Sequence, residues 1–595
     1  MLELLSELHR LPGLVLVLGA LVLPLLPVTL RRVAMVALPI LSYAQLLSLP
    51  EGIAFQVEIM DGLVLEPVRI DGLAMVWGHI FHIVAILASI YSLHVAERGV
   101  EQLAALSYAG SAIGAVMAGD FITLFVYWEL TAITSVFLIW SPADKNLDRD
   151  PAECLRTGMR YLVIQVSSGV ILLAGALAWL SARDWDPEAL RFGHLHSGSI
   201  FDAELGAQLV FLAFGIKAAF PLLHNWLQDA YPKGTHTGTV VLSAFTTKMA
   251  IYALARGFAG TDELIALGVF MTLFPIPFAV LENDLRRVLA YSLNNQLGFM
   301  CVGVGIGTAL SINGAAAHAF AHILYKSLLF MAMGAVLYKA GTCKATEIGG
   351  LYRKMPWTAA LCIVGSLSIS AMPLFSGFTT KSLTMSAAGE AHLTWVALLL
   401  LVASAGVVEH SGIKIPYSGF FSKEEGKKIT SQDIDGEAPL NMRVAMGLTA
   451  AMCIGLGLYP APLYAILPTP TDYEAYTAPH VVGQLQLLFF AALAYVLLKK
   501  RGLYPKEERK IFLDSDVLYR RFAPAIARAG WRRGLGPLWT GTLGLGAGLL
   551  RGSLGTLYRW TGPGGMFGRS WTAGGITRWS GAMIGFYLLY IFLWS

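Results

Sequence analysis

The chain has 595 residues, of which 56% are hydrophobic and only 14% are charged, and its formal net charge is +4. A water-soluble protein of this length needs many more charged residues to cover its surface, so the composition predicts a membrane protein. The basic residues are spread between apolar blocks and do not gather in patches. This distribution excludes nucleic-acid binding as the main function.

The five cysteines lie far apart in the sequence, and none forms a CxxC pair. Their spacing predicts neither a disulfide framework nor a zinc or iron–sulfur site, and we expect small buried side chains. The sequence carries no flavin, quinone or nicotinamide motif. We therefore expect no bound cofactor, no metal and no redox chemistry in this chain.

The N-terminal apolar run is predicted to be a retained membrane helix. The first ten residues include Glu3, Glu7 and Arg10, so they form no cationic region of the kind that begins a signal peptide. The apolar run 11–30 ends in Arg31-Arg32 without a small-residue cleavage site. Both features differ from those of a cleaved leader.

A membrane-spanning helix needs about 20 mostly apolar residues, and this window predicts about fourteen to sixteen spans. The fold class is therefore an all-α polytopic membrane protein. The predicted spans are 11–30, 33–50, 71–95, 103–119, 121–141, 160–182, 205–227, 237–257, 264–281, 287–309, 312–338, 357–388, 392–418, 441–466, 482–498 and 577–594.

The loops between these spans differ in charge from one side to the other, as the positive-inside rule requires. If the N-terminus is periplasmic, the cytoplasmic loops hold Arg31, Arg32, Arg98, Lys145, Arg149, Arg156, Arg286, Arg287, Lys344, Arg353, Lys354, Lys423, Lys427 and Lys428. The opposite loops hold Glu51, Glu58, Asp61, Glu66, Asp184, Asp186, Glu188, Asp262, Glu263, Asp472 and Glu474. The predicted location is a bacterial inner membrane.

The pattern changes from about residue 499. After Asp516 there are nine arginines and no Asp, Glu or Lys. Interleaved Trp, Tyr and Leu indicate a segment that lies in the membrane interface before a last span. A flexible glycine-rich linker is the alternative interpretation.

Ionisable residues occur inside the predicted spans, where each costs on the order of 2.5–3.5 kcal/mol near the bilayer centre. Glu129 lies about midway along one apolar run, and a nearby cation would keep it ionised. Lys217 precedes Pro221, which should interrupt its helix, and interrupted helices at membrane depth mainly line cavities. Pro373 and Lys381 repeat this arrangement, which indicates two structural repeats with one ion site each. The alternative is two unrelated kinked helices whose lysines pair structurally.

A third group comprises Lys248 and, further along the chain, His318, His322 and Lys326. The i, i+4, i+8 spacing places the last three on one helix face. Two histidines four residues apart could bind zinc, but no third ligand is evident nearby. A titratable row that relays protons is the favoured interpretation, because imidazole changes charge near neutral pH.

These segments resemble the antiporter-like subunits of respiratory complex I and of Mrp-type cation/proton antiporters. The matching motifs are Gly119-Asp120-Phe with Trp128-Glu129-Leu, Lys217-Ala-Ala-Phe-Pro221-Leu, Leu289-Ala-Tyr-Ser, the His318, His322 and Lys326 row, and Pro373-Leu-Phe-Ser-Gly377-Phe-Thr-Thr-Lys381. Within that family, Ser404-Ala-Gly with His410-Ser-Gly-Ile-Lys414-Ile-Pro-Tyr resembles the D-type subunit of the Mrp antiporters. Gln165 stands where many relatives have histidine, and Glu409 adds an acid beside His410.

The resemblance implies fourteen core helices with two inverted five-helix repeats. It also implies a proton relay through a Glu129–Lys217 pair, a central Lys248, the His318, His322 and Lys326 row, and an exit at Lys381. The expected divisions are N-terminal helices (1–100), a first repeat (101–260), a second repeat (261–420), further helices (421–500), an arginine-rich lateral segment (501–576) and a terminal anchor (577–595).

Three functions remain open at this point. The leading one is a proton-translocating subunit of a multisubunit antiporter that exchanges protons for sodium or another cation. The others are the proton-pumping membrane arm of a redox complex and a gradient-driven subunit of an inorganic carbon uptake complex. We expect other subunits of a hetero-oligomeric membrane complex, protons, sodium and the lipid bilayer as the partners. The third function predicts a soluble partner instead.

Overall fold

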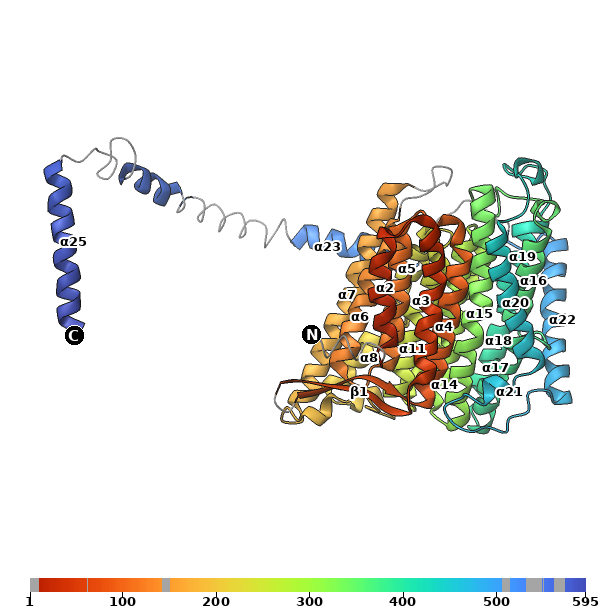
Figure 1. The fold of residues 1–595 in the computed structure, drawn as a ribbon. Helices are drawn as coiled ribbons and strands as arrows, with labels where there is room; N and C mark the ends of the chain where they lie inside the picture. Colours follow the sequence, from red (N-terminus) through yellow and green to blue (C-terminus); the bar gives the residue numbers. More distant parts are fainter. Residues whose placement is uncertain are drawn as a thin grey trace. The chain divides into compact units, whose positions relative to one another are not determined.

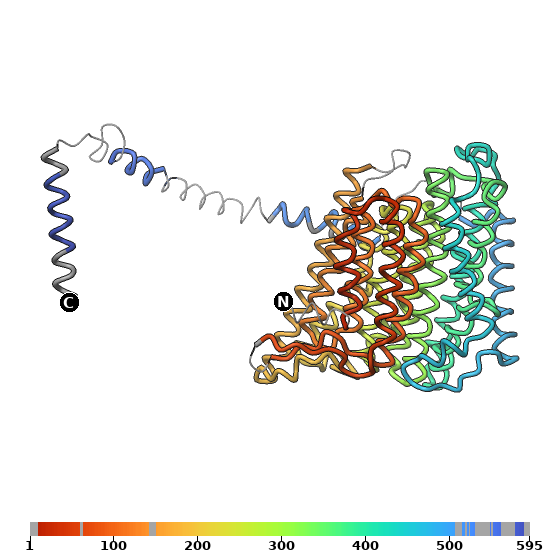
Figure 2. The backbone as a smooth tube through the Cα atoms, in the orientation of Figure 1, coloured from red at the N-terminus to blue at the C-terminus, as the bar shows by residue number. Residues whose placement is uncertain are grey.

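The computed structural model describes residues 10–60, 63–141, 150–505, 514–530, 548, 551–560 and 573–594. The chain divides into two compact units, Met1–Phe512 and Leu513–Ser595. The first unit is a bundle of long helices, and Figure 2 shows that the earlier helices (red to yellow) form one side of it and the later helices (green to blue) the other.

The helices of the first unit account for every span predicted between residues 11 and 498. They are α2 (Pro12–Val22), α3 (Val28–Ser48), α4 (Gly72–Tyr91), α5 (Gly99–Met117), α6 (Phe121–Trp140), α7 (Pro151–Ser181), α8 (Leu205–Lys217), α9 (Asn225–Ala230), α10 (Gly238–Ala244), α11 (Thr246–Gly257), α12 (Asp262–Leu273), α13 (Pro275–Leu281), α14 (Leu285–Ile306), α15 (Ala309–Ala340), α16 (Pro356–Ile369), α17 (Ser376–Glu390), α18 (Thr394–Val407), the π-helix η8 (Val408–Ile413), α19 (Lys414–Pro416), the π-helix η9 (Tyr417–Phe421), α20 (Leu440–Leu458), α21 (Ala461–Tyr464) and α22 (Ala478–Lys500) (Figure 1).

Within the described part of the chain, ten helical segments are long and apolar enough to cross a membrane. Helix α15 lies at the centre of the bundle, where it packs against α4, α10, α14, α16, α17 and α20. The prediction of an all-α polytopic membrane protein is confirmed.

Two interruptions divide the spans that contain Lys217 and Lys381. Between α8 and α9, Ala219 and Leu222 have φ angles of 62° and 69°; between α16 and α17, Ala371 and Leu374 have φ angles of 55° and 77°. Residues other than glycine rarely adopt positive φ. Because the same Ala-x-Pro-Leu sequence makes the same unusual turn twice, the predicted interruptions at Pro221 and Pro373 are confirmed.

A β-hairpin covers one end of the bundle, which we call the hairpin face (Figure 1). Strands β1 (Gly52–Met60) and β2 (Leu63–Ile70) pair antiparallel in the segment that the sequence analysis treated only as an acidic loop. The buried Glu66 joins the hairpin to the bundle: its backbone N–H donates to Asp120 Oδ2 (2.8 Å) and its side chain pairs with Arg191 (2.9 Å). The helix ends next to Arg98, Arg286 and Lys344 form the opposite end, which we call the basic face.

The second unit contains the π-helix η11 (Leu518–Phe522), α23 (Ala523–Gly530) and α25 (Ala573–Trp594). Helix α25 includes the predicted terminal span 577–594. Much of the predicted arginine-rich segment 501–576 lies outside the described residues, as do Lys145 and Arg149 of the predicted cytoplasmic loops.

Candidate functional site

The ionisable residues singled out in the sequence lie within the helices of the bundle. Six of the seven are almost completely buried: Lys217, Lys248, His318, His322, Lys326 and Lys381 are each 0–4% exposed. Glu129 in α6 is half-buried. The structure therefore places ionisable groups in an apolar interior, where each needs a partner or a function.

Lys217 is the last residue of α8, and it is held by α6. Its Nζ donates to the Trp128 carbonyl oxygen and to Thr131 Oγ1 (2.9 Å), and it lies 4.5 Å from the centre of the Trp128 ring. Among the described residues, Glu129 makes no ion pair within 4.0 Å and its Oε1 has no hydrogen-bond partner. Glu129 and Lys217 nevertheless interact electrostatically, so they form a pair without direct contact.

Space for the Glu129 carboxylate is provided by Gly169 in α7. A Cβ atom at position 169 would lie 1.6 Å from Glu129 Oε1, which no real contact allows. One turn earlier on α7, Gln165 is fully buried, and neither polar atom of its side chain has a partner among the described residues. Polar atoms of this kind are commonly paired with ordered water, so the surroundings of Glu129 suit water molecules that carry protons.

Lys248 and Lys381 are each held at a helix end created by a break. Lys248 Nζ donates to the Ser243 carbonyl oxygen (2.6 Å) near the end of α10, and Lys381 Nζ donates to the Ile369 carbonyl oxygen (2.9 Å) at the end of α16. The last carbonyl groups of a helix lack partners within it and carry its partial negative charge. A helix break therefore supplies the acceptor that a buried ammonium group needs.

The three residues on α15 are held less firmly. His318 makes two long hydrogen bonds of 3.4 Å, with Thr380 Oγ1 and Tyr325 Oη. The two ring nitrogens of His322 have no hydrogen-bond partner among the described residues. The Nζ of Lys326 has none among them either. The two histidine rings are 6.0 Å apart, so one helix face carries three titratable groups in a row.

Electrostatic interactions connect this row to the anchored lysines. The charges of Lys248 and Lys381 act on His318, His322 and Lys326. The structure therefore brings together five of the seven residues around α15, while Glu129 and Lys217 form a separate pair between α6 and α8. Within the described part of the chain, no group of three or more His, Cys, Asp or Glu residues is placed to hold a metal ion.

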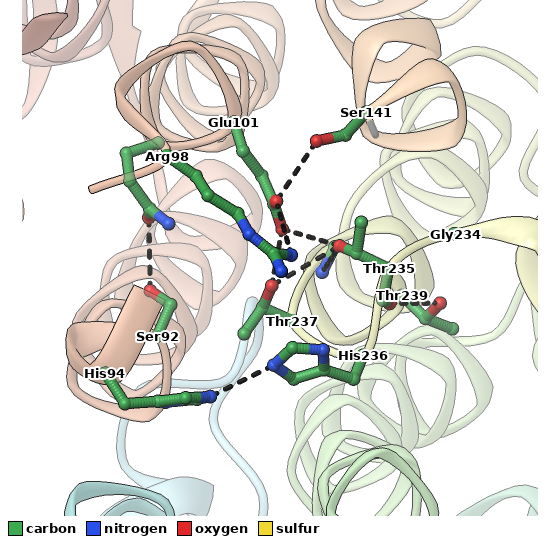
Figure 3. A network of polar contacts seen from close by, with 12 residues as sticks. Ser92, His94, Arg98, Glu101, Ser141, Gly234, Thr235, His236, Thr237 and Thr239 are labelled. Carbon is green, nitrogen blue, oxygen red and sulfur yellow. Dashed lines mark hydrogen bonds and ion pairs between the residues drawn. The ribbon is translucent and has the colours of Figure 1, made fainter. Parts of the chain in front are cut away.

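A polar network at the basic face escaped the sequence analysis (Figure 3). Its centre is Glu101 of α5, which is 3% exposed and accepts hydrogen bonds from Thr235 Oγ1 (2.5 Å), Thr237 Oγ1 and Ser141 Oγ (3.1 Å). Arg98 lies 3.5 Å from the same carboxylate. The network ties α5 and the end of α6 to the segment that precedes α10.

Beside Glu101 lies a cavity of about 20 Å³, enough for roughly one water molecule. Its lining extends from Gln102 and Ser92 at the basic face to Phe245, which is three residues from Lys248. Gln102 is 3% exposed, and its Nε2 has no partner among the described residues. The cavity has polar residues at the basic face and apolar residues toward the α10–α11 break.

Two histidines close the network on its other side (Figure 3). His94 lies in the short helix η3 (Leu93–Val95), and its Nε2 is 3.0 Å from Nε2 of His236. Burial lowers the pKa of His94 to about 4, so this ring is neutral at pH 7. Glu101 and His94 lie near helix ends, outside any apolar periodic run, and only the spacing of Thr235, His236 and Thr237 in a polar run could have drawn attention to this region.

Comparison with known proteins matches a large part of this chain. Residues 118–406 match the family model described as NADH:quinone oxidoreductase/Mrp antiporter, TM. Hydrogenase-4 component B of Escherichia coli is 25% identical over 524 residues, which cover 80% of this chain and 76% of that protein. The D-type subunit of the Na(+)/H(+) antiporter of Alkalihalophilus pseudofirmus is 30% identical over 281 residues, covering 45% of this chain and 55% of that protein.

The fold is also shared with a solved structure. A chain of the Mrp complex from Dietzia sp. DQ12-45-1b superposes with a TM-score of 0.69 and 24% identity, over 92% of this chain and 63% of that one. This chain thus spans only part of several of its relatives. The matched region, residues 118–406, contains both interrupted helices, and this region belongs to the family of transmembrane subunits shared by NADH:quinone oxidoreductases and Mrp antiporters.

Proposed function

We propose that this chain is the proton-translocating subunit of a multisubunit cation/proton antiporter, with sodium as the leading cation. The observation that carries the proposal is the row of buried, protonatable groups around α15, three of which lie on one helix face. Arginine cannot lose its proton in a protein, whereas lysine and histidine can, and only the latter two types line the row. Other subunits of the complex provide the cation path.

The route begins at the Glu129–Lys217 pair. A proton that reaches Glu129 removes the negative charge that acts on Lys217. The change in charge then passes to Lys248 and along His318, His322 and Lys326 to Lys381. Because a charged form is favoured by an opposite charge and disfavoured by a like charge, each transfer alters the next site.

We further propose that the membrane is a bacterial inner membrane and that the basic face is cytoplasmic, as the positive-inside rule requires. Lys423 and Asp472 are both exposed, and all five native cysteines are buried. In intact cells, an impermeant thiol reagent should therefore modify Asp472→Cys and spare Lys423→Cys. The reverse pattern would overturn the orientation.

A second candidate is the proton-pumping arm of a redox complex, which the match to Hydrogenase-4 component B over 80% of the chain favours. The two candidates differ in the driving reaction and share the proposed relay. Cation-dependent proton flux in inverted vesicles that hold the whole complex, without an electron donor, supports the antiporter. Flux that requires an electron donor supports the redox arm.

The relay itself is tested with Glu129→Gln and Lys217→Arg. Both variants keep the size and polarity of the side chain, and each removes the ability to exchange a proton at that position. We expect flux to fall by about a hundredfold or more, the effect typical of losing a proton-transfer group. Immunoblots check that the complex assembles. Near-normal flux in either variant would show that this pair is structural.

A further inference from the structure

A relay along the membrane plane must also open on to both faces. In the second repeat, Lys381 is anchored at the break between α16 and α17. The part of the bundle between Lys326 and the basic face contains a span of unusual geometry: α18 is followed by η8 and, after the single turn α19, by η9. π-Helical turns are rare and occur frequently at functional sites.

His410 is the buried titratable group of η8. Its ring is 0% exposed, Nδ1 lies 2.9 Å from Ser411 Oγ, and Nε2 has no hydrogen-bond partner among the described residues. The charges of Lys326, Lys381 and Lys414 all act on this ring. His410 is therefore an electrostatic neighbour of the α15 row, although it lies on a different helix.

Glu409, the residue before His410, contacts the segment that follows α22. Its Oε1 accepts a hydrogen bond from the Tyr504 hydroxyl. Tyr504 also lines a pocket of about 470 Å³, together with Lys427, Lys499 and Glu425. This pocket lies at the end of α22 that carries Lys499, so it opens at the basic face. Only the Tyr504 side chain separates it from Glu409.

Lys414 is a positive charge near both groups, and it is fixed in place. Its charge acts on both Glu409 and His410. Its Nζ donates to the carbonyl oxygens of Ala279, Val280 and Glu282 at the end of α13. A lysine with three acceptors provides a constant positive charge that holds an anion beside it.

We propose that Glu409 and His410 form a proton entry route that joins the basic face to Lys326, an inference that rests on the proposed function. A proton from the pocket binds the Glu409 carboxylate and passes through water to Nε2 of His410. His410 then transfers a proton to Lys326, which returns both groups to their starting states. Together with Lys381, this route completes a path across the membrane within the second repeat.

Glu409 could instead have a structural role, which would be to hold Tyr504. Two variants separate this role from proton transfer. Glu409→Gln keeps an oxygen that accepts the Tyr504 hydrogen bond and removes the proton site. Tyr504→Phe removes the hydrogen bond and keeps the acid. Tyr495→Phe is its control, because the Tyr495 ring lies edge-on to Tyr504 (4.9 Å between ring centres) and its hydroxyl pairs with Lys499. We expect Glu409→Gln to lower proton flux by about a hundredfold, Tyr504→Phe to lower it by much less, and Tyr495→Phe to retain most of it.

The experiment uses the whole complex in inverted vesicles, with proton flux followed by a pH-sensitive dye. A second arm attaches a bulky thiol reagent to Glu425→Cys in the pocket, with the exposed Lys354→Cys outside the pocket as control. Labelling should lower flux at position 425 only. Full flux in Glu409→Gln, or in labelled Glu425→Cys, would overturn the route. Absence of flux in the wild-type complex would instead overturn the proposed function.

Discussion

The lysines at the helix breaks and the lysine in the unbroken helix α15 are held in opposite ways. Lys217, Lys248 and Lys381 each donate to a carbonyl oxygen next to an interruption or in a neighbouring helix. Lys326, within the continuous α15, has no acceptor among the described residues. The first three positions stabilise an ammonium group by a hydrogen bond. At the fourth position, only the charges of neighbouring residues act on the ammonium group.

The difference indicates separate tasks for the two kinds of lysine. A group with a fixed acceptor holds its proton until a neighbouring charge changes, because the hydrogen bond favours the charged form. A buried cation without acceptors is costly, so it suits a site that is occupied only briefly. In the proposed relay, the anchored lysines are the resting positions, and His322 and Lys326 are the exchange point between them.

The largest effect is expected for Lys326→Met. Methionine fits the apolar surroundings of α15 and breaks no hydrogen bond among the described residues, so the complex should assemble normally. Proton flux in inverted vesicles should fall by about a thousandfold, within the range for loss of a proton-transfer group. Unchanged flux would show that protons bypass α15.

A matched control is Lys339→Met on the same helix. Lys339 lies at the basic face and pairs with the exposed Asp435 (2.7 Å). Exposed pairs contribute about 0–1 kcal/mol, so this variant should change neither flux nor stability measurably. If both lysine variants lose flux equally, general damage to α15 is the cause.

The second effect concerns the space next to Glu129. In Gly169→Ala the added methyl group would occupy the place of the carboxylate oxygen, which must move. A displacement of about 1 Å can lower a rate by up to about a hundredfold, and we expect flux to fall by at least about tenfold. Gly455→Ala on α20 is the control, because its added Cβ meets nothing within 4 Å. Equal flux in both variants would mean that the position of Glu129 is unimportant.

The sequence predicted the interruptions well because their cause is local. A proline inside a helix removes a backbone hydrogen bond, which favours an interruption at Pro221 and Pro373. The spacing of His318, His322 and Lys326 places them on one face of any helix. The β-hairpin also has a local signal that was not used: Asp61-Gly62 between two apolar-rich runs is typical of a hairpin turn.

The remaining features of the candidate site depend on contacts between distant segments. The acceptor of Lys217 lies 89 residues away in α6, and Glu101 meets Thr235 from 134 residues away. The π-helical turn that contains His410 was also not predicted from the sequence. Sequence reasoning could name the ionisable groups, but it could not say which of them have acceptors.

A smaller effect should follow the loss of one anchor of Lys217. Thr131→Val removes the 2.9 Å hydrogen bond from Nζ, and hydrogen bonds to charged groups contribute about 1.5–3 kcal/mol. Thr134→Val is the matched control, because both threonines donate to a carbonyl oxygen of α6 and only Thr131 meets the lysine. We expect thermal unfolding of the purified complex to shift down only for Thr131→Val. Equal shifts would show that the Trp128 carbonyl holds Lys217 by itself.

The smallest effect is expected for a change in the backbone at the break between α8 and α9. Leu222 has a φ of 69° and is 64% exposed, so its side chain fills no core space. A left-handed conformation costs an L-residue about 1–2 kcal/mol, and glycine avoids this cost but loses about 0.5–1 kcal/mol of conformational entropy on folding. Leu222→Gly should therefore raise stability by up to about 1 kcal/mol, a small rise in the unfolding temperature. The adjacent Leu223 does not have a positive φ, and Leu223→Gly should lower stability because it gains no such relief. A loss of stability in both variants would show that contacts of the Leu222 side chain, and not its backbone angle, determine the geometry of the break.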